Sequence, residues 1–197
     1  ICSLIRDDSV EQFISYVNKN NIPLSSKIKK SLFESNLSLI KYQLTLIEYA
    51  SFFGSIQIFQ FLQMSEVKLK HTLWINSIHS NNSDFICNYI EKIDEFDEEN
   101  KKIDYFSIYR ESIKCHHNDI ANYIKDKYLS NEEISPKEFI CLYTKYQNTR
   151  FLQENDIDIL YIQNFAKYDY FLIVQYLLNT SSELSLKFNI EIFHSNI

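Results

Sequence analysis

The sequence contains very little glycine and proline. Gly54 is the one glycine among 197 residues, and Pro23 and Pro136 are the two prolines. Sheet-rich folds need glycine for tight hairpins, and the common phosphate-binding loops need several glycines close together. The low glycine content therefore excludes a sheet-rich fold and the common phosphate-binding loops. We expect helices joined by short connections of Asn, Ser and Asp.

The chain also lacks an excess of positive charge and a long apolar run. Its formal net charge is −6 and its pI is about 5.4, whereas nucleic-acid-binding proteins concentrate Lys and Arg. The most apolar segment, Tyr161–Leu178, is interrupted by Lys167 and Asp169 and is too polar to span a membrane. The acidic run Asp94–Glu99 is interpreted as a solvated loop. We expect no nucleic-acid binding and no membrane insertion.

The four cysteines do not form a paired motif. Cys2, Cys87, Cys115 and Cys141 are widely spaced, without a CxxC pair. With no secretory signal in the sequence, this pattern favours reduced thiols in an intracellular, cytoplasmic protein. Hydrophobic residues make up 45% of the chain and charged residues 23%, which is typical of a folded domain. A start at Ile1 in place of Met suggests an excerpt of a longer protein.

A two-part segment recurs along the chain. In Thr45–Leu62, a stripe of apolar residues over Leu46–Phe53 is followed by Gly54 and then by a second apolar stripe. Two short antiparallel helices joined at Gly54 explain both halves. Similar segments are Leu4–Val17, Leu73–Ile90, Tyr109–Ile124 and Ile162–Leu178. We therefore expect repeated helix pairs.

The residues aligned with Gly54 give a sharper test of this repeat. They are Asp8, Asn81, His116 and Asp169. A turn between two helices often needs one residue at positive φ, and Asn, Asp and His are the side chains most enriched there after glycine. The column therefore predicts the same left-handed turn in each pair.

Other columns of the alignment predict what is buried. The column of Ala50 also contains Leu4, Ser77, Ser112 and Phe165. The second helices share three apolar columns, which read Ile58, Phe85, Ile120 and Ile173; Phe13, Phe59, Ile86, Ala121 and Val174; and Tyr16, Leu62, Tyr89, Ile124 and Leu177. The single Trp74 aligns with Ile47 and Tyr109, so we expect it in the core.

Thr45–Leu62 resembles the ankyrin repeat, whose pattern is T-P-L-H-x-A on the first helix, a Gly turn and a Val/Leu-rich second helix. The matching residues are Thr45, Ile47, Ala50, Gly54, Ile58, Phe59 and Leu62, while Leu46 replaces the family's Pro and Glu48 its His. The segment Ser112–Ile124 and the opening ICSLIRDDSVEQF look like a protist-expanded ankyrin-like domain family of unknown function.

This resemblance implies an all-α, ankyrin-like helix-turn-helix repeat solenoid. It implies a single array over 1–197 with about five to six degenerate repeats. The best-defined repeats are 45–64, 72–91, 107–126 and 162–178, and the degenerate ones are 1–17 and 138–152. The connections Met64–His71 and Glu91–Asp104 contain no glycine, so the family's hairpins are expected to be reduced to loops.

The resemblance also implies a function without chemistry: a monomeric protein–protein interaction scaffold that needs no cofactor and holds an unidentified partner protein on its concave face. The family's concave positions lie on the first helices, just before and just after the Ala50 column. They correspond to Arg6, Asp7, Tyr49, Phe52, Phe53, Asn76, His79, Ser80, Glu111, Lys114, Cys115, Asn164, Lys167 and Tyr168. Phe52 and Phe53 would be good interface anchors, unless they pack on a neighbouring repeat.

The run Cys115–His117 favours a different class, a small zinc- or thiol-dependent enzyme on a helical fold. Neighbouring residues on one tight turn cannot all face one ion, so His79, Cys87 and Cys141 would have to converge on it from elsewhere. The simpler interpretation is that His116 holds the turn and Cys115 lies near the surface, with no metal and no catalytic residue. A structural spacer without a dedicated ligand is a third alternative.

The turn column gives a first testable prediction. Gly54→Val is expected to lower the free energy of unfolding by roughly 1–2 kcal/mol, because β-branched residues resist the left-handed region. Thermal denaturation measures this change. An unchanged melting temperature would contradict the predicted turn.

Overall fold

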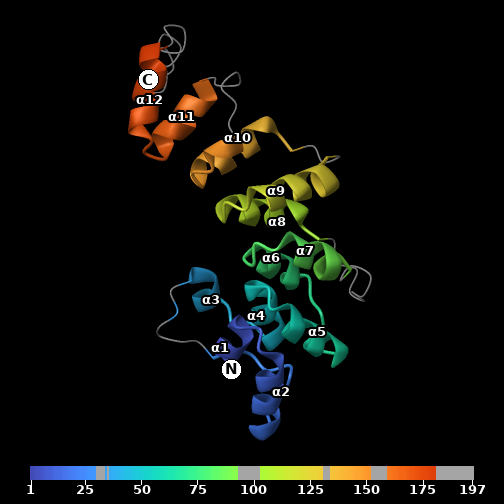
Figure 1. Cartoon of the computed structure of the whole chain (residues 1–197). Helices are drawn as coiled ribbons and strands as arrows, with labels where there is room; N and C mark the ends of the chain where they lie inside the picture. The colour runs from blue at the N-terminus through green and yellow to red at the C-terminus, as the bar shows by residue number, and fades with distance from the viewer. Residues whose placement is uncertain (30–33, 35, 93–102, 131–133, 152–158, 181–197) are drawn as a thin grey trace. The chain divides into compact units, whose positions relative to one another are not determined.

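The computed structural model describes residues 1–29, 34, 36–92, 103–130, 134–151 and 159–180 (Figure 1). Most of these residues are helical, and none belongs to a β-strand; one isolated antiparallel bridge joins Lys27 to Thr45. The prediction of an all-α chain is confirmed at this level. The acidic run Asp94–Glu99 and Leu152, the last residue of the predicted repeat 138–152, lie outside the described residues.

The helices are short, and Figure 1 labels most of them. In chain order they are α1 (Cys2–Arg6), α2 (Val10–Lys19), α3 (Leu37–Lys41), α4 (Leu46–Phe53), α5 (Ile56–Met64), α6 (Thr72–Ile78), α7 (Ser83–Phe85), the π-helical turn η1 (Ile86–Ile90), α8 (Tyr105–Lys114), α9 (Asn118–Ile124), the π-helical turn η3 (Lys125–Leu129), α10 (Pro136–Lys145), the 3₁₀ turn η4 (Thr149–Phe151), α11 (Ile159–Lys167) and α12 (Phe171–Thr180).

The chain divides into two compact units, Ile1–Ile120 and Ala121–Ile197. In the first unit, α1 packs on α2 and α4 packs on α5, and the first helices of successive pairs also touch, α1 on α4, α4 on α6 and α6 on α8. In the second unit, α10 packs on α11 and α11 packs on α12. Within each unit the first helices therefore lie next to one another.

The predicted left-handed turn is confirmed at every aligned position. Gly54 has φ +67°, and the aligned Asp8, Asn81, His116 and Asp169 have φ of 48°, 50°, 59° and 62°. Gln147, which follows α10, has φ of 58°. Glycine at position 54 is needed for a second reason as well, because an added Cβ would lie 2.9 Å from the Cβ of Ser80.

The turn carries the same backbone hydrogen bond in most pairs. The N–H of the residue that follows the left-handed one donates to the carbonyl five residues earlier, the bond of a Schellman motif. These bonds are Ser9 to Leu4 (3.0 Å), Ser55 to Ala50 (2.9 Å), His117 to Ser112 (3.0 Å), Asn148 to Tyr143 (2.9 Å) and Tyr170 to Phe165 (2.9 Å). Four of the five acceptors belong to the Ala50 column, so the alignment of that column reflects a shared backbone geometry.

The predicted core is buried in the middle of the chain and partly exposed towards its ends. Phe13, Phe59, Ile86 and Ala121 are almost completely buried, and the Trp74 ring is fully buried edge-on against Tyr105. The prediction of buried columns is wrong for two other residues: Tyr16 on α2 is 41% exposed and Ile173 on α12 is 36% exposed. Both residues lie on the second helix of their pair, α2 or α12.

Loops replace hairpins where the connection is described. Residues 64–71 contain no strand, as the missing glycines predict, and the connection 91–104 is described only at its two ends. The four cysteines are free thiols, in agreement with the sequence interpretation.

Polar side chains join successive helix pairs. Both carboxylate oxygens of Asp8 accept hydrogen bonds from α5, one from the Gln57 N–H and one from the Ile58 N–H, each at 3.0 Å. The α5 N-cap Ser55 makes no side-chain capping bond; its hydroxyl instead donates to the Ile5 carbonyl at 2.5 Å. The turn of the first pair therefore caps the second helix of the next pair.

Asp8 thus has two roles that mutation can separate. Asp8→Gly keeps the left-handed turn and removes the cap, so it is expected to cost about 1 kcal/mol of unfolding free energy. The matched variant His116→Gly changes an exposed turn residue with a similar φ, and is expected to stay within about 0.5 kcal/mol of the parent, because relief of the left-handed strain offsets the extra freedom of the unfolded chain. Equal losses in denaturant melts of the two variants would contradict the capping role.

Candidate functional site

Eight of the predicted concave residues form one continuous string on the first helices of the first unit. We call it the aromatic–polar row: Arg6 on α1; Tyr49, Phe52 and Phe53 on α4; His79 at the end of α6; and Glu111, Lys114 and Cys115 on or just after α8. It links helices from four successive pairs.

The first part of the row is aromatic. The Arg6 guanidinium lies over the Phe53 ring, 5.7 Å from its centroid. The Phe53 centroid is 4.7 Å from that of Tyr49 and 5.2 Å from that of Phe52. A guanidinium over an aromatic face is attracted by the ring's negative charge density, so Arg6 and Phe53 form one contact surface.

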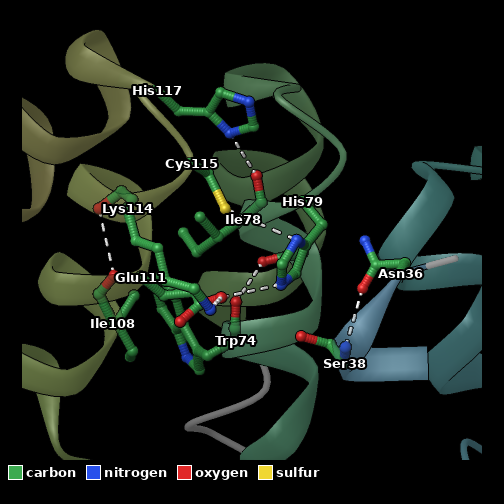
Figure 2. Close-up of polar contacts among 12 residues, drawn as sticks. Asn36, Ser38, Trp74, Ile78, His79, Ile108, Glu111, Lys114, Cys115 and His117 are labelled. Carbon is green, nitrogen blue, oxygen red and sulfur yellow. Dashed lines mark hydrogen bonds and ion pairs between the residues drawn. The ribbon is translucent and has the colours of Figure 1, made fainter. Parts of the chain in front are cut away.

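The middle of the row is the imidazole of His79, which joins three neighbours. The Phe52 ring stacks on it with centroids 4.3 Å apart and planes 16° from parallel. Its Nε2 lies 3.2 Å from Oε1 of Glu111, and its Nδ1 lies 3.6 Å from Sγ of Cys115. Figure 2 shows these polar contacts, together with the 2.8 Å ion pair that Lys114 Nζ makes with the same Glu111 oxygen.

Local helix geometry explains why these side chains meet. Glu111 and Cys115 are four residues apart, so both project from the same face of α8 and its C-terminal cap. His79 and Cys115 are the C-cap residues of α6 and α8, and each shortly precedes a left-handed residue, Asn81 or His116. Because α6 packs on α8, the ends of the two helices bring the imidazole to the thiol and the carboxylate.

Burial divides the row into packed and open residues. Tyr49 is 3% exposed and Phe52 is 5% exposed, whereas Phe53 is half-buried and Arg6 is exposed. Burial raises the pKa of Tyr49 to about 12. Of the two alternatives for Phe52, packing on a neighbouring pair is the one observed, because its ring stacks on His79; Phe53 keeps a surface that a partner could touch.

The surroundings of His79 shift the pKa of both of its polar neighbours, Glu111 and Cys115. The hydrogen bond from His79, assisted by Lys114, lowers the pKa of Glu111 to about 2, although burial acts in the opposite direction. Burial, together with the Glu111 carboxylate, raises the pKa of the Cys115 thiol to about 11. At neutral pH the row therefore holds an ionised carboxylate beside a protonated thiol.

The other predicted concave residues lie outside this string. In the first unit, Asp7 is exposed, Asn76 is half-buried, and the Ser80 hydroxyl donates to the Ser77 carbonyl at 2.7 Å. In the second unit, Asn164 is 6% exposed and accepts a hydrogen bond from Cys141 Sγ at 3.3 Å, so its assignment to an open face is wrong. The Lys167 ammonium, also in the second unit, lies 5.6 Å from the centroid of the Tyr168 ring.

The run Cys115–His117 does not gather around one point. His116 is exposed at the turn, as predicted, and His117 Nδ1 donates to the Ile78 carbonyl at 2.7 Å. Of the three residues that we required to converge from elsewhere, His79 meets Cys115, while Cys141 bonds to Asn164. Cys87 lies on η1, the second-helix side of its pair.

Sequence reasoning missed Glu111 as a chemical partner of His79. Two signals pointed to it: the four-residue spacing from Cys115, and the alignment that sets Ser77 beside Ser112 in adjacent pairs. Either signal alone is common on exposed helices, so neither was enough to predict the contact.

Protein-family models, curated proteins and solved structures yield no match to this chain. Among the described helices, none has the length and apolar character to cross a bilayer.

The raised thiol pKa predicts slow alkylation of Cys115. At pH 8 its thiolate fraction is expected to be about a hundredfold below that of an ordinary cysteine, because two pKa units separate them. Glu111→Gln removes a negative charge and should speed iodoacetamide labelling several-fold, whereas Lys114→Gln removes a positive charge and should slow it. Mass spectrometry of the Cys115 peptide measures both rates. Changes in the same direction would contradict the electrostatic explanation.

Proposed function

We propose that this chain is a non-catalytic scaffold of the ankyrin-like repeat type that binds a partner protein inside the cell through the aromatic–polar row. The observation that carries the proposal is the continuity of the row, from the Arg6–Phe53 contact to the Glu111–Lys114 ion pair. The row spans four successive first helices, and in repeat arrays such a surface is the usual place for a partner.

The residue types of the row support an interface. Interface cores are enriched in Tyr, Phe and Arg, and a few aromatic or Arg side chains supply most of the binding free energy. The half-buried Phe53 ring beneath Arg6 combines both types. Tyr49 and Phe52 lie behind Phe53 and hold it in place, so the ring loses little freedom when a partner docks.

The repeated backbone supports the ankyrin-like assignment. Five helix pairs share a left-handed residue in the same alignment column, and four of them share the Schellman bond to the Ala50 column. The Thr45–Leu62 pattern adds the sequence resemblance. A stack of like pairs with short connections is the arrangement that such sequences favour.

A thiol enzyme is the second candidate, and one observation favours it. Three side chains follow the order nucleophile, base and orienting carboxylate. Cys115 contacts His79 through Sγ and Nδ1, and His79 contacts Glu111 through Nε2 and Oε1. However, nucleophilic cysteines have a lowered thiol pKa, whereas that of Cys115 is raised to about 11. The scaffold is therefore the better supported function. Fast labelling of Cys115 at neutral pH would instead favour the thiol enzyme.

The row can be tested with a matched pair of double variants. Arg6→Ser with Phe53→Ser removes the open contact of the row. Arg110→Ser with Phe106→Ser removes the same residue types, with the guanidinium 6.0 Å from the ring centroid, at two positions that are not part of the row. Binding of a purified partner, first isolated by affinity capture, is expected to weaken about tenfold or more for the row variant, because aromatic and Arg anchors each contribute above 1 kcal/mol.

The control variant is expected to keep its affinity within about twofold. Thermal melts of both variants separate a lost contact from a lost fold, since each pair combines one exposed Arg with one half-buried Phe. Phe52 is not used, because truncating a buried ring would destabilise the fold. Equal affinities for the two double variants would contradict the row as the binding surface.

A further inference from the structure

Three side chains of the row carry the atoms that transition metals bind. His79, Glu111 and Cys115 each offer one ligand atom, and these atoms all lie within 4.8 Å of one another. They come from the ends of α6 and α8, two adjacent first helices of the same unit (Figure 2). Imidazole nitrogen, thiolate sulfur and carboxylate oxygen are the three ligand types that zinc takes in proteins.

Two of the separations are close to those that one ion would impose. With bonds of about 2.0–2.3 Å, tetrahedral zinc holds its ligand atoms about 3.3–3.8 Å apart. The distance from His79 Nε2 to Glu111 Oε1 is 3.2 Å, and that from His79 Nδ1 to Cys115 Sγ is 3.6 Å. Because these contacts use different ring nitrogens, small shifts of the imidazole and of the Glu111 or Cys115 side chain are needed to bring one nitrogen and both other ligand atoms to the ion.

The surroundings favour such a site. The Phe52 ring lies flat against the imidazole, with centroids 4.3 Å apart, and limits it to shifts that keep the two ring planes nearly parallel. The side chains of His79 and Glu111 are 11% and 17% exposed, so the position is sheltered but reachable from solvent. Thiolate and carboxylate together balance a dication, and Lys114, now 2.8 Å from the Glu111 oxygen, is a flexible side chain that can move away.

We propose that His79, Glu111 and Cys115 bind one zinc ion and thereby clamp the end of α6 to the end of α8. On binding, the Cys115 thiol releases its proton to solvent and the sulfur coordinates as thiolate, so the protein supplies three ligands and water takes the fourth position. The sulfur and nitrogen ligands select zinc over magnesium and calcium, which prefer oxygen. The site does not rest on the proposed scaffold function, and it replaces our expectation from the sequence that the chain needs no metal.

The experiment uses the full chain, reduced and stripped with a chelator, then titrated with Zn²⁺ or with Co²⁺ as a spectroscopic substitute. The wild-type chain is expected to bind one equivalent, to melt at a higher temperature with zinc, and to show a thiolate-to-cobalt charge-transfer band. Magnesium and calcium serve as controls and are expected to produce no such rise in melting temperature.

Variants then identify the ligands. Each of three substitutions is expected to weaken zinc binding about tenfold or more: Cys115→Ser, His79→Gln and Glu111→Gln. Cys115→Ser should also abolish the charge-transfer band. Cys87→Ser changes another half-buried cysteine and His116→Asn changes the exposed histidine next to Cys115; both should bind zinc as the wild type does. Circular dichroism of each metal-free variant checks its fold.

Two results would overturn the proposal. One is a wild-type chain that gives no thiolate band with stoichiometric cobalt, a measurement that does not depend on any variant. The other is a Cys115→Ser chain that keeps the band or the wild-type zinc affinity.

Discussion

The helix pairs depend on one residue held at positive φ within three residues of the end of the first helix. This residue reverses the chain within a short turn, and the Schellman bond then satisfies a carbonyl that the end of the helix would leave without a partner. Gly54 takes this conformation without strain, but the chain has no second glycine. Asp, Asn and His fill the equivalent positions, and they bring polar side chains to turns where glycine would bring none. The Asp8 carboxylate shows the consequence, because it caps a helix of the next pair.

The column that accepts this bond also affects how closely the first helices approach. The residue that accepts the Schellman bond is Ala50 in one pair and Ser112 in another, and both are fully buried. Ser77 of the same column is also small and fully buried, and these side chains let α4 pack on α6 and α6 pack on α8. Residues just beyond this column then reach across to the next helix, which is why Phe52 stacks on His79 and His79 contacts Cys115. The row is thus a product of the backbone geometry as well as of its own side chains.

The sequence predicted the features that recur in each helix pair better than the contacts between neighbouring pairs. The turn column follows from residue type, because Asn, Asp and His tolerate positive φ; Gln147 has no such preference, and no turn was predicted there although its φ is 58°. Similarly, α4 spans the predicted Leu46–Phe53, where Thr45 and Glu48 form a capping box. By contrast, Phe52 and Phe53 are identical residues in adjacent positions, and only the position of the neighbouring helix decides which is buried.

The meeting of His79, Glu111 and Cys115 lay beyond the sequence for a related reason. An alignment of repeats gives each residue a position along its own helix, but not its distance from the next helix. That distance depends on the small buried column and on the rotamers that it permits. The helix α3, Leu37–Lys41, was missed because it lies between the first two pairs and belongs to no repeated column.

The arrangement of the row limits how a partner could recognise it. Both nitrogens of His79 already face protein groups, and Phe52 covers one face of its ring, so recognition must depend on groups nearer the surface, above all Arg6 and Phe53. The chain carries a net charge of −6, so its overall field does not draw in an acidic partner from a distance. A cation such as Arg6 acts within about 10 Å, the range over which salt leaves charges unscreened. A partner would therefore gain specificity from short-range contact with the Arg6–Phe53 surface, with little help from long-range electrostatic steering.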